Sequence, residues 1–380
     1  MVGIAPDCSP KERRSKHRLA AIRRLTALLV VGLLSLSGFA HVGARQDDPA
    51  ARYAATDLGE IKGYPSTVAF ALNAKGVVVG QGYDPSTYLG RATIYRGGKL
   101  RALIKGEKGV SAAQDINAAG QIVGYVQASN DLTRATLWVS DEATNLGDLG
   151  GGSLAVAIND AGVVVGWSSS TADNHLHPIV WIDGEMTALE LLPKGERGMA
   201  LNINGDGLVV GFSTLGPDEQ GASAPQHAVA WEDGKPIDLG VIAGDYSEAL
   251  GINAAGQIVG RSTTGADQTE FGPGSHAVLW DGDEITDLGA LADGEISVAA
   301  AINARGEIVG RSSVAPGESF GQNHATLWRD GEVLDLNDLV EGGSDVVLDN
   351  AYDINDDGII VAMGKAGGIE HAFLLTPVDS

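Results

Sequence analysis

The sequence predicts an all-β protein, a seven-bladed β-propeller of four-stranded antiparallel blades, and three observations lead to this prediction. First, the phrase Ile-Asn-x-x-Gly-x-Val-Val-Gly recurs seven times with small changes. Second, each copy lies among four short apolar segments bounded by turn residues, and helical periodicity is absent after the first 44 residues. Third, the repeated region starts with a lone strand and ends with a strand that has no following partner. Pairing these two strands would close a ring.

The repeated asparagine marks a hairpin turn. Successive copies are 42 to 52 residues apart, and glycine follows three positions later in all seven. Asparagine opens a type I turn and glycine takes the left-handed position that closes a bulged hairpin. We therefore give a structural role to the seven asparagines, which are Asn73, Asn117, Asn159, Asn204, Asn253, Asn303 and Asn355.

The unit around Asn303 illustrates the four predicted strands, which are residues 285–288, 298–302, 307–310 and 325–328. An alanine stands four positions before the asparagine in every unit. A position that accepts only a methyl group is crowded, as on innermost strands near an axis. Five of the six tryptophans share one position in the fourth strand, where we expect them to pack between neighbouring sheets.

The ends of the repeated region predict how the ring closes. Residues 54–59 form the lone first strand, and residues 371–375 form the last one. If they pair, the last blade contains both ends and no sheet edge stays open. A β-solenoid is the alternative, but it does not need recurring hairpin turns at two places in each unit.

The first 44 residues have the composition of a signal peptide. A basic stretch precedes an apolar run over residues 25–40, and Val42-Gly43-Ala44 follows it. The run is shorter than the ~20 residues of a membrane-spanning helix. An uncleaved anchor is the alternative. We predict a signal peptide over 1–44, a linker over 45–52 and the propeller over 53–380, in a protein exported to the periplasm or the cell exterior.

The net charge excludes several partners. The chain has 26 basic and 49 acidic residues and a formal charge of −23. Residues 1–44 hold seven of the bases and two of the acids, so the remainder carries −28 (19 bases against 47 acids). Nucleic acid and anionic membranes are poor partners for such a surface. The single cysteine, Cys8, precedes the apolar run, so no disulfide is expected after cleavage. We expect a monomer with no cofactor and no membrane insertion once the signal is removed.

The phrases Asp-Leu-Gly, Ser-x-Ala-x-x-Ile-Asn-x-x-Gly-x-Val-Val-Gly and His-Ala-x-Leu-Trp together resemble the bacterial HAF-type extracellular repeat. The likeness covers about residues 53–378. His371-Ala372-Phe373 is the literal tripeptide, whereas the third unit has His177-Pro178 and the first two have Arg91 and Arg134. The resemblance implies an exported repeat protein with a propeller-like fold, and it transfers no catalytic residue.

The histidine of that tripeptide marks a position that recurs in every unit, with histidine in five units and arginine in two. We interpret it as a structural hydrogen-bonding group, for instance to a neighbouring turn; a ring of pH-responsive groups or a metal site, including the pair His175 and His177, is the alternative. The position holds Arg91, Arg134, His177, His227, His276, His324 and His371.

One turn has the first half of a calcium loop. Asp353, Asn355 and Asp357 are spaced as Asp-x-Asn-x-Asp-Gly. Gly364, however, stands at the twelfth position, where an EF-hand needs a bidentate glutamate. Because the hairpin already explains these residues, calcium is the alternative interpretation.

The longest loops predict where a ligand binds. In up-and-down sheets the Asn-x-x-Gly and Asp-Gly turns share one face, so the variable loops share the other. Three consecutive long loops, 215–226, 263–275 and 314–323, carry acidic and aromatic residues that form a predicted lip. A solvated loop set without a ligand is the alternative. The lip residues are Asp218, Glu219, Asp267, Glu270, Phe271, Glu318 and Phe320.

These features predict a binding or scaffold module whose partner is an extracellular polysaccharide or protein. Two other functions stay open. A carbohydrate-active hydrolase or lyase would use loop carboxylates, and its chemistry depends on their separation. An adhesion or matrix-assembly repeat would associate with itself or with the cell surface. No nucleophile elbow, zinc helix or phosphate loop occurs after residue 44.

Overall fold

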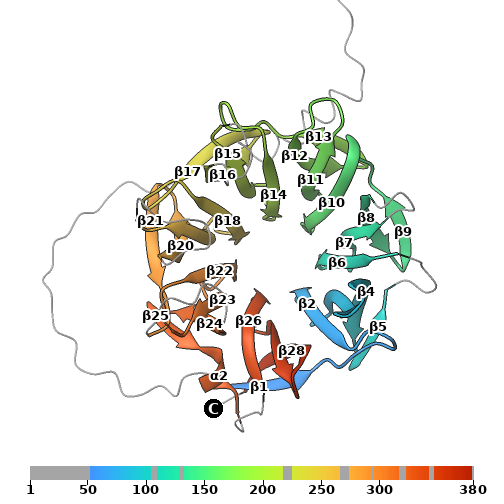
Figure 1. Cartoon of the computed structure of the whole chain (residues 1–380), viewed down its shortest axis with the longest axis vertical. Helices are drawn as coiled ribbons and strands as arrows, with labels where there is room; N and C mark the ends of the chain where they lie inside the picture. The colour runs from blue at the N-terminus through green and yellow to red at the C-terminus, as the bar shows by residue number, and fades with distance from the viewer. Residues whose placement is uncertain are drawn as a thin grey trace, which may run out of the picture. The chain divides into compact units, whose positions relative to one another are not determined.

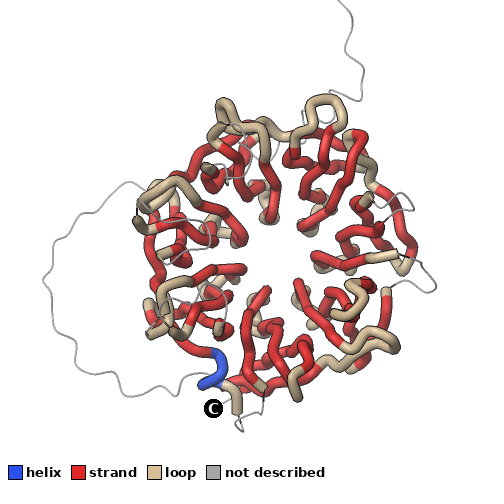
Figure 2. Tube along the Cα trace, viewed as in Figure 1, coloured by secondary structure: helices blue, strands red, loops and turns tan. Residues whose placement is uncertain are grey.

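The computed structural model describes residues 52–103, 109–127, 132–216, 225–265, 274–292, 294–315, 322–341 and 346–378. These residues form seven four-stranded antiparallel sheets. Figure 1 shows the sheets as blades around a central axis, and Figure 2 shows strands joined by loops, with one short helix. The predicted signal peptide lies outside the described residues. Among those residues, no helix combines the length and apolar character needed to cross a membrane.

Blades 1 to 4 follow the chain in order, each from its innermost to its outermost strand. Blade 1 contains β2 (Ser66–Leu72), β3 (Val78–Asp84), β4 (Leu89–Arg96) and β5 (Lys99–Ala102). Blade 2 contains β6 (Ser111–Ile116), β7 (Ile122–Gln127), β8 (Thr133–Val139) and β9 (Glu142–Asn145). Blade 3 contains β10 (Gly150–Ile158), β11 (Val164–Ser170), β12 (Leu176–Ile182) and β13 (Glu185–Ala188). Blade 4 contains β14 (Gly198–Ile203), β15 (Val209–Thr214), β16 (Gln226–Glu232) and β17 (Lys235–Gly240).

Blades 5 to 7 complete the ring. Blade 5 contains β18 (Ser247–Ile252), β19 (Ile258–Thr263), β20 (Ser275–Asp281) and β21 (Glu284–Gly289). Blade 6 contains β22 (Ser297–Ile302), β23 (Ile308–Ser313), β24 (Asn323–Arg329) and β25 (Glu332–Asp335), which the short helix α2 (Leu336–Leu339) follows. Blade 7 contains β26 (Val347–Ile354), β27 (Ile360–Ala366), β28 (Ile369–Val378) and, as its outermost strand, β1 (Arg52–Asp57).

The pairing of β1 with β28 closes the ring, as predicted. The two strands are antiparallel, and their register runs from Arg52 opposite Val378 to Asp57 opposite Phe373. Figure 1 shows β1 beside the last strands of the chain. Seven core clusters lie at the seven joints between adjacent blades, so every blade buries both of its faces.

The repeat is displaced by one strand relative to the blade. The first predicted strand of the unit around Asn303, residues 285–288, lies in β21 and pairs with β20 of blade 5. The other three predicted strands belong to blade 6. The reason is the tight turn before β21, which forms a hairpin inside one blade, so the chain crosses to the next blade only after Asp-Leu-Gly.

Each innermost strand contains a β-bulge next to the repeated alanine. In blade 1 the register passes from Ala69 opposite Gly80 to Ala71 opposite Val79, so Phe70 is an extra residue. The bulge brings the two backbones so close that a Cβ at Gly80 would lie 2.0 Å from the Val68 carbonyl oxygen. Glycine at the end of the repeated Val-Val-Gly is therefore a steric requirement of the bulge. Blade 7 differs by having Ala362 at this position.

The repeated asparagines form a closed ring of hydrogen bonds between blades. Asn73 Oδ1 accepts the backbone N–H groups of Lys75 and Val77 in its own turn. Asn73 Nδ2 donates to the backbone oxygen of Asn117 in the next blade, at 3.1 Å. The same bond recurs around the whole ring, and at the last joint Asn355 donates back to the Asn73 oxygen. All seven asparagines are buried.

A serine or threonine at the start of the innermost strand links most blades to the preceding one. In blade 5, Ser247 Oγ accepts the Ala228 N–H of blade 4 at 2.8 Å and donates to the Gly240 oxygen at 2.7 Å. The tryptophans lie at the joints, as expected. Trp280 packs in the core between blades 4 and 5 and donates to the Leu239 oxygen of blade 4. The acceptors in the other serine links are Thr67, Ser111, Ser153 and Ser297.

The joint between blades 3 and 4 lacks this serine link. Pro178 stands where other blades have the alanine that donates, and Gly198 stands where they have serine. Proline has no N–H and glycine has no hydroxyl, so neither loss leaves a buried group without a partner. A Cβ at Gly198 would also lie 2.6 Å from Leu191 Cδ2 and 2.9 Å from the Phe212 oxygen. The two substitutions therefore compensate for each other.

The serine link can be tested with two buried serines. We expect Ser247→Ala to lower the free energy of unfolding by about 1–3 kcal/mol, because the Ala228 N–H is buried and loses its acceptor. Ser275→Ala is the matched control, because Ser275 is also buried and its hydroxyl has no hydrogen-bond partner among the described residues. Urea unfolding should show little change for the control. Equal losses of unfolding free energy in the two variants would contradict a stabilising role of the serine link.

The asparagine ring gives a second prediction. We expect Asn253→Ala to destabilise the protein by about 2 kcal/mol or more, because it removes one bond to Asn303 and two bonds inside its own turn. Asn145→Ala is the control, because Asn145 is exposed and accepts one turn N–H, from Gly147. Chemical unfolding followed by circular dichroism would measure both variants. A loss at Asn253 no larger than the loss at Asn145 would show that the ring contributes nothing.

Candidate functional site

The bulges leave one half-buried side chain per blade on the innermost strand. In blade 1 the neighbours of Phe70 are buried at opposite joints, Ala69 against blade 7 and Ala71 against blade 2. Phe70 lies between them in the chain and meets the Tyr352 ring of blade 7 edge to face, with the ring centres 5.8 Å apart. Bulges commonly re-aim a side chain. We call the seven residues the bulge ring, and they are Phe70, Gln114, Val156, Leu201, Leu250, Ala300 and Tyr352.

A second set of half-buried side chains follows the repeated glycine on the second strand of each blade. We call these residues the collar. Gln81 Nε2 of blade 1 donates to the Ser111 oxygen of blade 2, and Gln81 also hydrogen-bonds with Tyr125. Collar side chains of adjacent blades therefore meet one another. The collar consists of Gln81, Tyr125, Trp167, Phe212, Arg261, Arg311 and Met363.

The collar breaks the sevenfold repeat in chemistry. Three consecutive blades, 2 to 4, have the aromatic residues Tyr125, Trp167 and Phe212, and blades 5 and 6 have the two arginines. Trp167 is half-buried, whereas the other five tryptophans are at most 4% exposed. Within the described part of the chain, none of the three collar rings stacks on another. They are three separate flat surfaces.

The arginine part of the collar is a rigid polar network. Arg261 Nη2 lies 2.8 Å from Glu248 Oε2 and donates to the Tyr246 hydroxyl at 2.7 Å. The guanidinium also stacks 5.0 Å from the Tyr246 ring centre. The pKa of Arg311 is lowered, first by burial and then by the neighbouring charge of Arg261, while Tyr352 acts in the opposite direction.

The seven predicted lip residues lie outside the described residues, so the lip stays a prediction. The strands that lead into their loops are described. β15, β19 and β23 end at Thr214, Thr263 and Ser313, two residues after Phe212, Arg261 and Arg311 respectively. Three of the seven collar residues, Phe212, Arg261 and Arg311, therefore precede the three predicted lip loops by a few residues in the chain.

In four of the seven blades the histidine pairs with an aspartate on the outermost strand of the same blade. In blade 4, His227 Nδ1 lies 2.8 Å from Asp238, the aspartate of Asp-Leu-Gly on the outermost strand, and Asp238 also accepts the Gly240 N–H. His276, His324 and His371 pair with Asp287, Asp335 and Asp57 in the same way. The His371 pair therefore joins β28 to β1 at the ring closure.

The other three blades replace the aspartate and use different partners. Ala102, Asn145 and Ala188 stand at its position. Arg91 and Arg134 donate to the Gly109 and Gly151 oxygens of the next blade, and His177 Nε2 lies 2.9 Å from Asp173. His175 lies 3.9 Å from Glu196 and 4.0 Å from Asp173. Among the described residues, no three His, Cys, Asp or Glu side chains come close enough to hold a metal ion.

The calcium-loop residues are used by the fold. Asp353 accepts the N–H of Ile354 and, across the joint to blade 1, the N–H of Leu72. Asn355 Oδ1 accepts two turn N–H groups, and Asp357 is exposed. The oxygens of Asp353 and Asn355 that a calcium ion would need therefore already accept backbone hydrogen bonds.

Asp115 and Asp353, which occupy equivalent positions on innermost strands, have raised pKa values. Burial raises the pKa of Asp353 to about 7 and that of Asp115 to about 6, although backbone N–H groups oppose the shift in both. Asp115 bridges blades 2 and 3, because it accepts the N–H of Ile158 at 2.8 Å. Asn202 occupies the equivalent position in blade 4 and donates to the Leu250 oxygen of blade 5.

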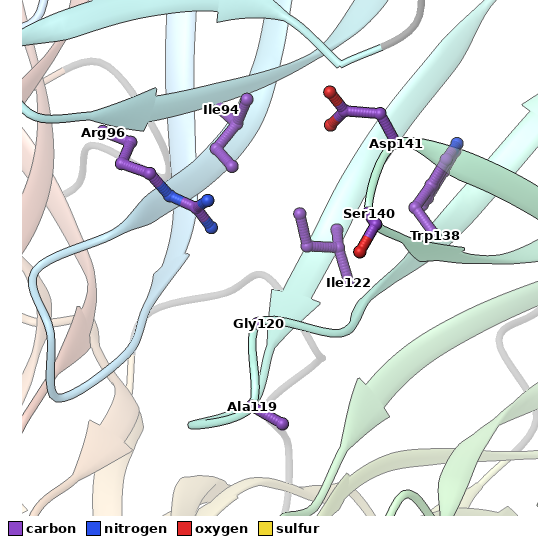
Figure 3. Close-up of a pocket in the computed structure, with 8 residues that line it drawn as sticks. All are labelled: Ile94, Arg96, Ala119, Gly120, Ile122, Trp138, Ser140 and Asp141. Atoms are coloured by element: carbon purple, nitrogen blue, oxygen red, sulfur yellow. The ribbon is translucent and has the colours of Figure 1, made fainter.

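A small cavity lies on the opposite, tight-turn face between blades 1 and 2. Its volume is about 120 Å³, room for a few water molecules and less than the roughly 300 Å³ of small-molecule sites. Figure 3 shows Arg96 extending from blade 1 beside the Gly120 turn, with Ser140 and Asp141 across the cavity. Its size and position separate this cavity from the collar. The lining residues are Ile94, Arg96, Ala119, Gly120, Ile122, Trp138, Ser140 and Asp141.

The comparisons with known proteins show the fold alone. No protein-family model and no curated protein matches the sequence. Among solved structures, the β-propeller domain of the Trilobed protease from Pyrococcus furiosus is similar, with a TM-score of 0.55 and 12% identity over 82% of this chain and 93% of that one. The Pyrococcus horikoshii acylaminoacyl peptidase gives 0.51 and 12% over 84% of this chain and 53% of that one. The protease propeller is described as an open Velcro, whereas β1 and β28 close the ring here.

The raised pKa of Asp353 predicts how stability depends on pH. Because its folded pKa of about 7 exceeds the ordinary value of 3.8, the folded state holds the proton more tightly than the unfolded state. We expect stability to fall as pH rises from about 4 to about 7 and then to level off at this residue. Asp353→Asn, which copies Asn202, should reduce this fall. The exposed variant Asp357→Asn should keep it, as unfolding at a series of pH values would show. If the stability of Asp353→Asn fell with pH as steeply as that of the unchanged protein, the fall could not be assigned to Asp353.

Proposed function

We propose that the protein is an exported binding module whose ligand lies across the collar on the variable-loop face. One observation carries the proposal: the chemistry of the collar differs between blades at a position that is structurally equivalent in all seven. The repeated Asn, Ser, Gly and Trp side chains are used by the turns and joints. The half-buried residues Tyr125, Trp167 and Phe212 follow the repeated glycine and differ from the residues at the equivalent positions of the other blades. Aromatic surfaces of this kind bind flat apolar faces of sugars or side chains.

The geometry favours binding over hydrolysis. A glycosidase needs two carboxyl groups about 5 to 10 Å apart beside its substrate. The carboxylates around the collar already have partners: Glu248 pairs with Arg261, Asp349 lies 3.6 Å from Lys365, and Glu370 accepts the Tyr83 hydroxyl. The hydrolase alternative therefore depends on the loop carboxylates outside the described residues. Export is part of the proposal, and its support is the composition of residues 1–44.

The test is binding by the purified protein. We expect one class within a panel of oligosaccharides and peptides, each with calcium or chelator, to raise the melting temperature. At a hundredfold excess over Kd, binding stabilises the fold by about 2.7 kcal/mol. Trp167→Ala should weaken that ligand about tenfold or more. Because Trp167 is half-buried, the melting temperature of the unliganded variant is measured beside it, which separates lost binding from lost stability.

Tyr88→Ala is the control for this experiment. Tyr88 lies in the β3–β4 loop on the same face and is 85% exposed, but it is not part of the collar. Its removal should leave binding unchanged. A ligand whose affinity is insensitive to Trp167→Ala would move the site away from the collar. Turnover of the bound sugar would favour the hydrolase alternative.

A further inference from the structure

The tight-turn face of blade 1 is basic. Its two turns contain Lys75, Arg96 and Lys99 and no acidic residue. In blades 2 to 6 the turn that corresponds to residues 96–99 contains more acidic than basic side chains. One cause is Gly97, which takes the left-handed conformation that an aspartate has in blades 3, 4 and 6. The chain as a whole has a net charge of −23, so this blade differs from its surroundings.

The small cavity between blades 1 and 2 lies beside these basic turns. Three of its lining residues supply hydrogen-bond donors, namely the Arg96 guanidinium, the Ser140 hydroxyl and the Ala119 backbone N–H. Within the part of the chain that the structure describes, none of these three donors has a hydrogen bond or an ion pair. Arg96 lies against the Gly120 turn, because a Cβ at Gly120 would be 3.7 Å from Arg96 Nη2. Figure 3 shows Arg96 and Ser140 on opposite sides of the cavity.

The backbone N–H of Ala119 differs from its equivalents in the other blades. In the other six Asn-x-x-Gly turns this N–H donates to the asparagine Oδ1, for example from Lys75 to Asn73 at 3.0 Å. In blade 2 the Asn117 oxygen accepts the N–H of Gln121, and no such bond from Ala119 occurs among the described residues. The turn of blade 2 therefore keeps a backbone donor at the cavity.

The charges that face the cavity leave one positive charge without a counterion. Asp141 lines the cavity too, but both of its oxygens accept from Arg101 Nη2, at 2.9 and 3.1 Å. Arg96 then remains as the uncompensated charge. The charged groups around this core are two bases and two acids, which balance each other. They are Lys75, Lys99, Glu142 and Asp160.

The size and charge of the cavity favour a single carboxylate. A volume of about 120 Å³ holds a functional group, so the rest of the ligand lies outside on the exposed turns. A glutamate side chain reaches inward on two methylene groups, whereas the carboxylate of a uronic acid is attached directly to a bulky ring. A doubly charged phosphate would exceed the single positive charge and would meet Asp141. Guanidinium groups bind carboxylates with two parallel hydrogen bonds.

We propose that this cavity binds a glutamate side chain of an acidic peptide segment in a partner protein. Arg96 pairs with the carboxylate, and Ser140 and Ala119 supply further donors to it. Lys75 and Lys99 attract neighbouring acidic residues of the same segment. The site lies on the face opposite the collar, so the inference goes beyond the proposed function. At 0.15 M salt the screening length is about 8 Å, so groups in direct contact decide the affinity despite the acidic chain.

The test compares two dye-labelled peptides, hexaglutamate and hexaglutamine, both capped at their ends. Binding to the full chain is measured by fluorescence anisotropy at 0.15 M salt. We expect hexaglutamate to bind about tenfold or more tightly than hexaglutamine, and Arg96→Gln to remove most of this difference. Arg96→Lys should keep part of it, because the charge is retained while the bidentate geometry is lost. Ser140→Ala should weaken hexaglutamate by a smaller factor.

Arg305→Gln is the matched control. Arg305 also lies in a turn on the tight-turn face, but it is paired with Glu307, so its removal should leave hexaglutamate binding nearly unchanged. Equal weakening by Arg96→Gln and Arg305→Gln would show a general attraction of charge and overturn the site. Equal binding of the two peptides, or binding of neither, would overturn it as well. The melting temperature of each variant without peptide shows that the fold is retained.

Competition distinguishes the peptide from other anions. Inorganic phosphate and a galacturonic acid hexamer are added to the labelled hexaglutamate complex at equal concentrations of anionic groups. We expect unlabelled hexaglutamate to displace the labelled peptide and the other two anions to displace little of it. Displacement by phosphate or by the uronate as effective as that by hexaglutamate would overturn the preference for a glutamate side chain.

Discussion

The structure depends on one interaction, the side-chain amide of an asparagine that serves two blades at once. Its oxygen accepts two N–H groups of its own turn, and its nitrogen donates to the backbone oxygen of the same asparagine in the next blade. Each asparagine is a donor to the next blade and an acceptor from the preceding one. Every asparagine can therefore have both partners only if the last blade bonds to the first. Asn355 makes this return by bonding to Asn73. The ring fixes where each turn lies relative to its neighbours and thereby sets the register of all seven innermost strands.

The sequence predicted the local features of the fold, the tryptophans at the joints and the closing strand pair, but missed the hydrogen bonds between blades. The turn asparagine, its glycine and the crowded alanine each have a cause within one hairpin, so their spacing was enough to predict them. The partner of an asparagine amide or of Ser247 lies in another blade, about 20 to 52 residues away. One signal was available: His227, His276, His324 and His371 have an aspartate at a fixed outer-strand position, whereas Arg91, Arg134 and His177 do not. This correlation within the chain indicates the pairing.

The collar was missed for a different reason. A comparison of the seven repeat units identifies the residues that the units share. Those are the residues that the turns and the joints between blades require. The collar follows the repeated glycine directly, but its seven members range from Gln81 to Trp167 and Arg311, so they leave no common pattern. The bulge explains why this variety is tolerated. The glycine is fixed by the backbone of the innermost strand, whereas the next side chain is half-buried and meets few constraints. A binding site on a repeat fold needs positions that are structurally equivalent in every blade but hold chemically different side chains.

The joint between blades 3 and 4 involves both the positions of the serine link and the collar. Trp167 lies opposite Pro178 in the sheet, whereas the other six collar residues lie opposite an alanine. Pro178 removes the N–H that the serine link would use, and the matching Gly198 removes the hydroxyl. At the joint between blades 6 and 7 the usual serine is also missing, but Asn337 bonds both backbone groups of Leu348 there. Blades 3 and 4 have no such replacement at these two positions. The fold therefore lacks a repeated hydrogen bond beside Trp167, at the centre of the aromatic arc of Tyr125, Trp167 and Phe212 where the proposed ligand site lies.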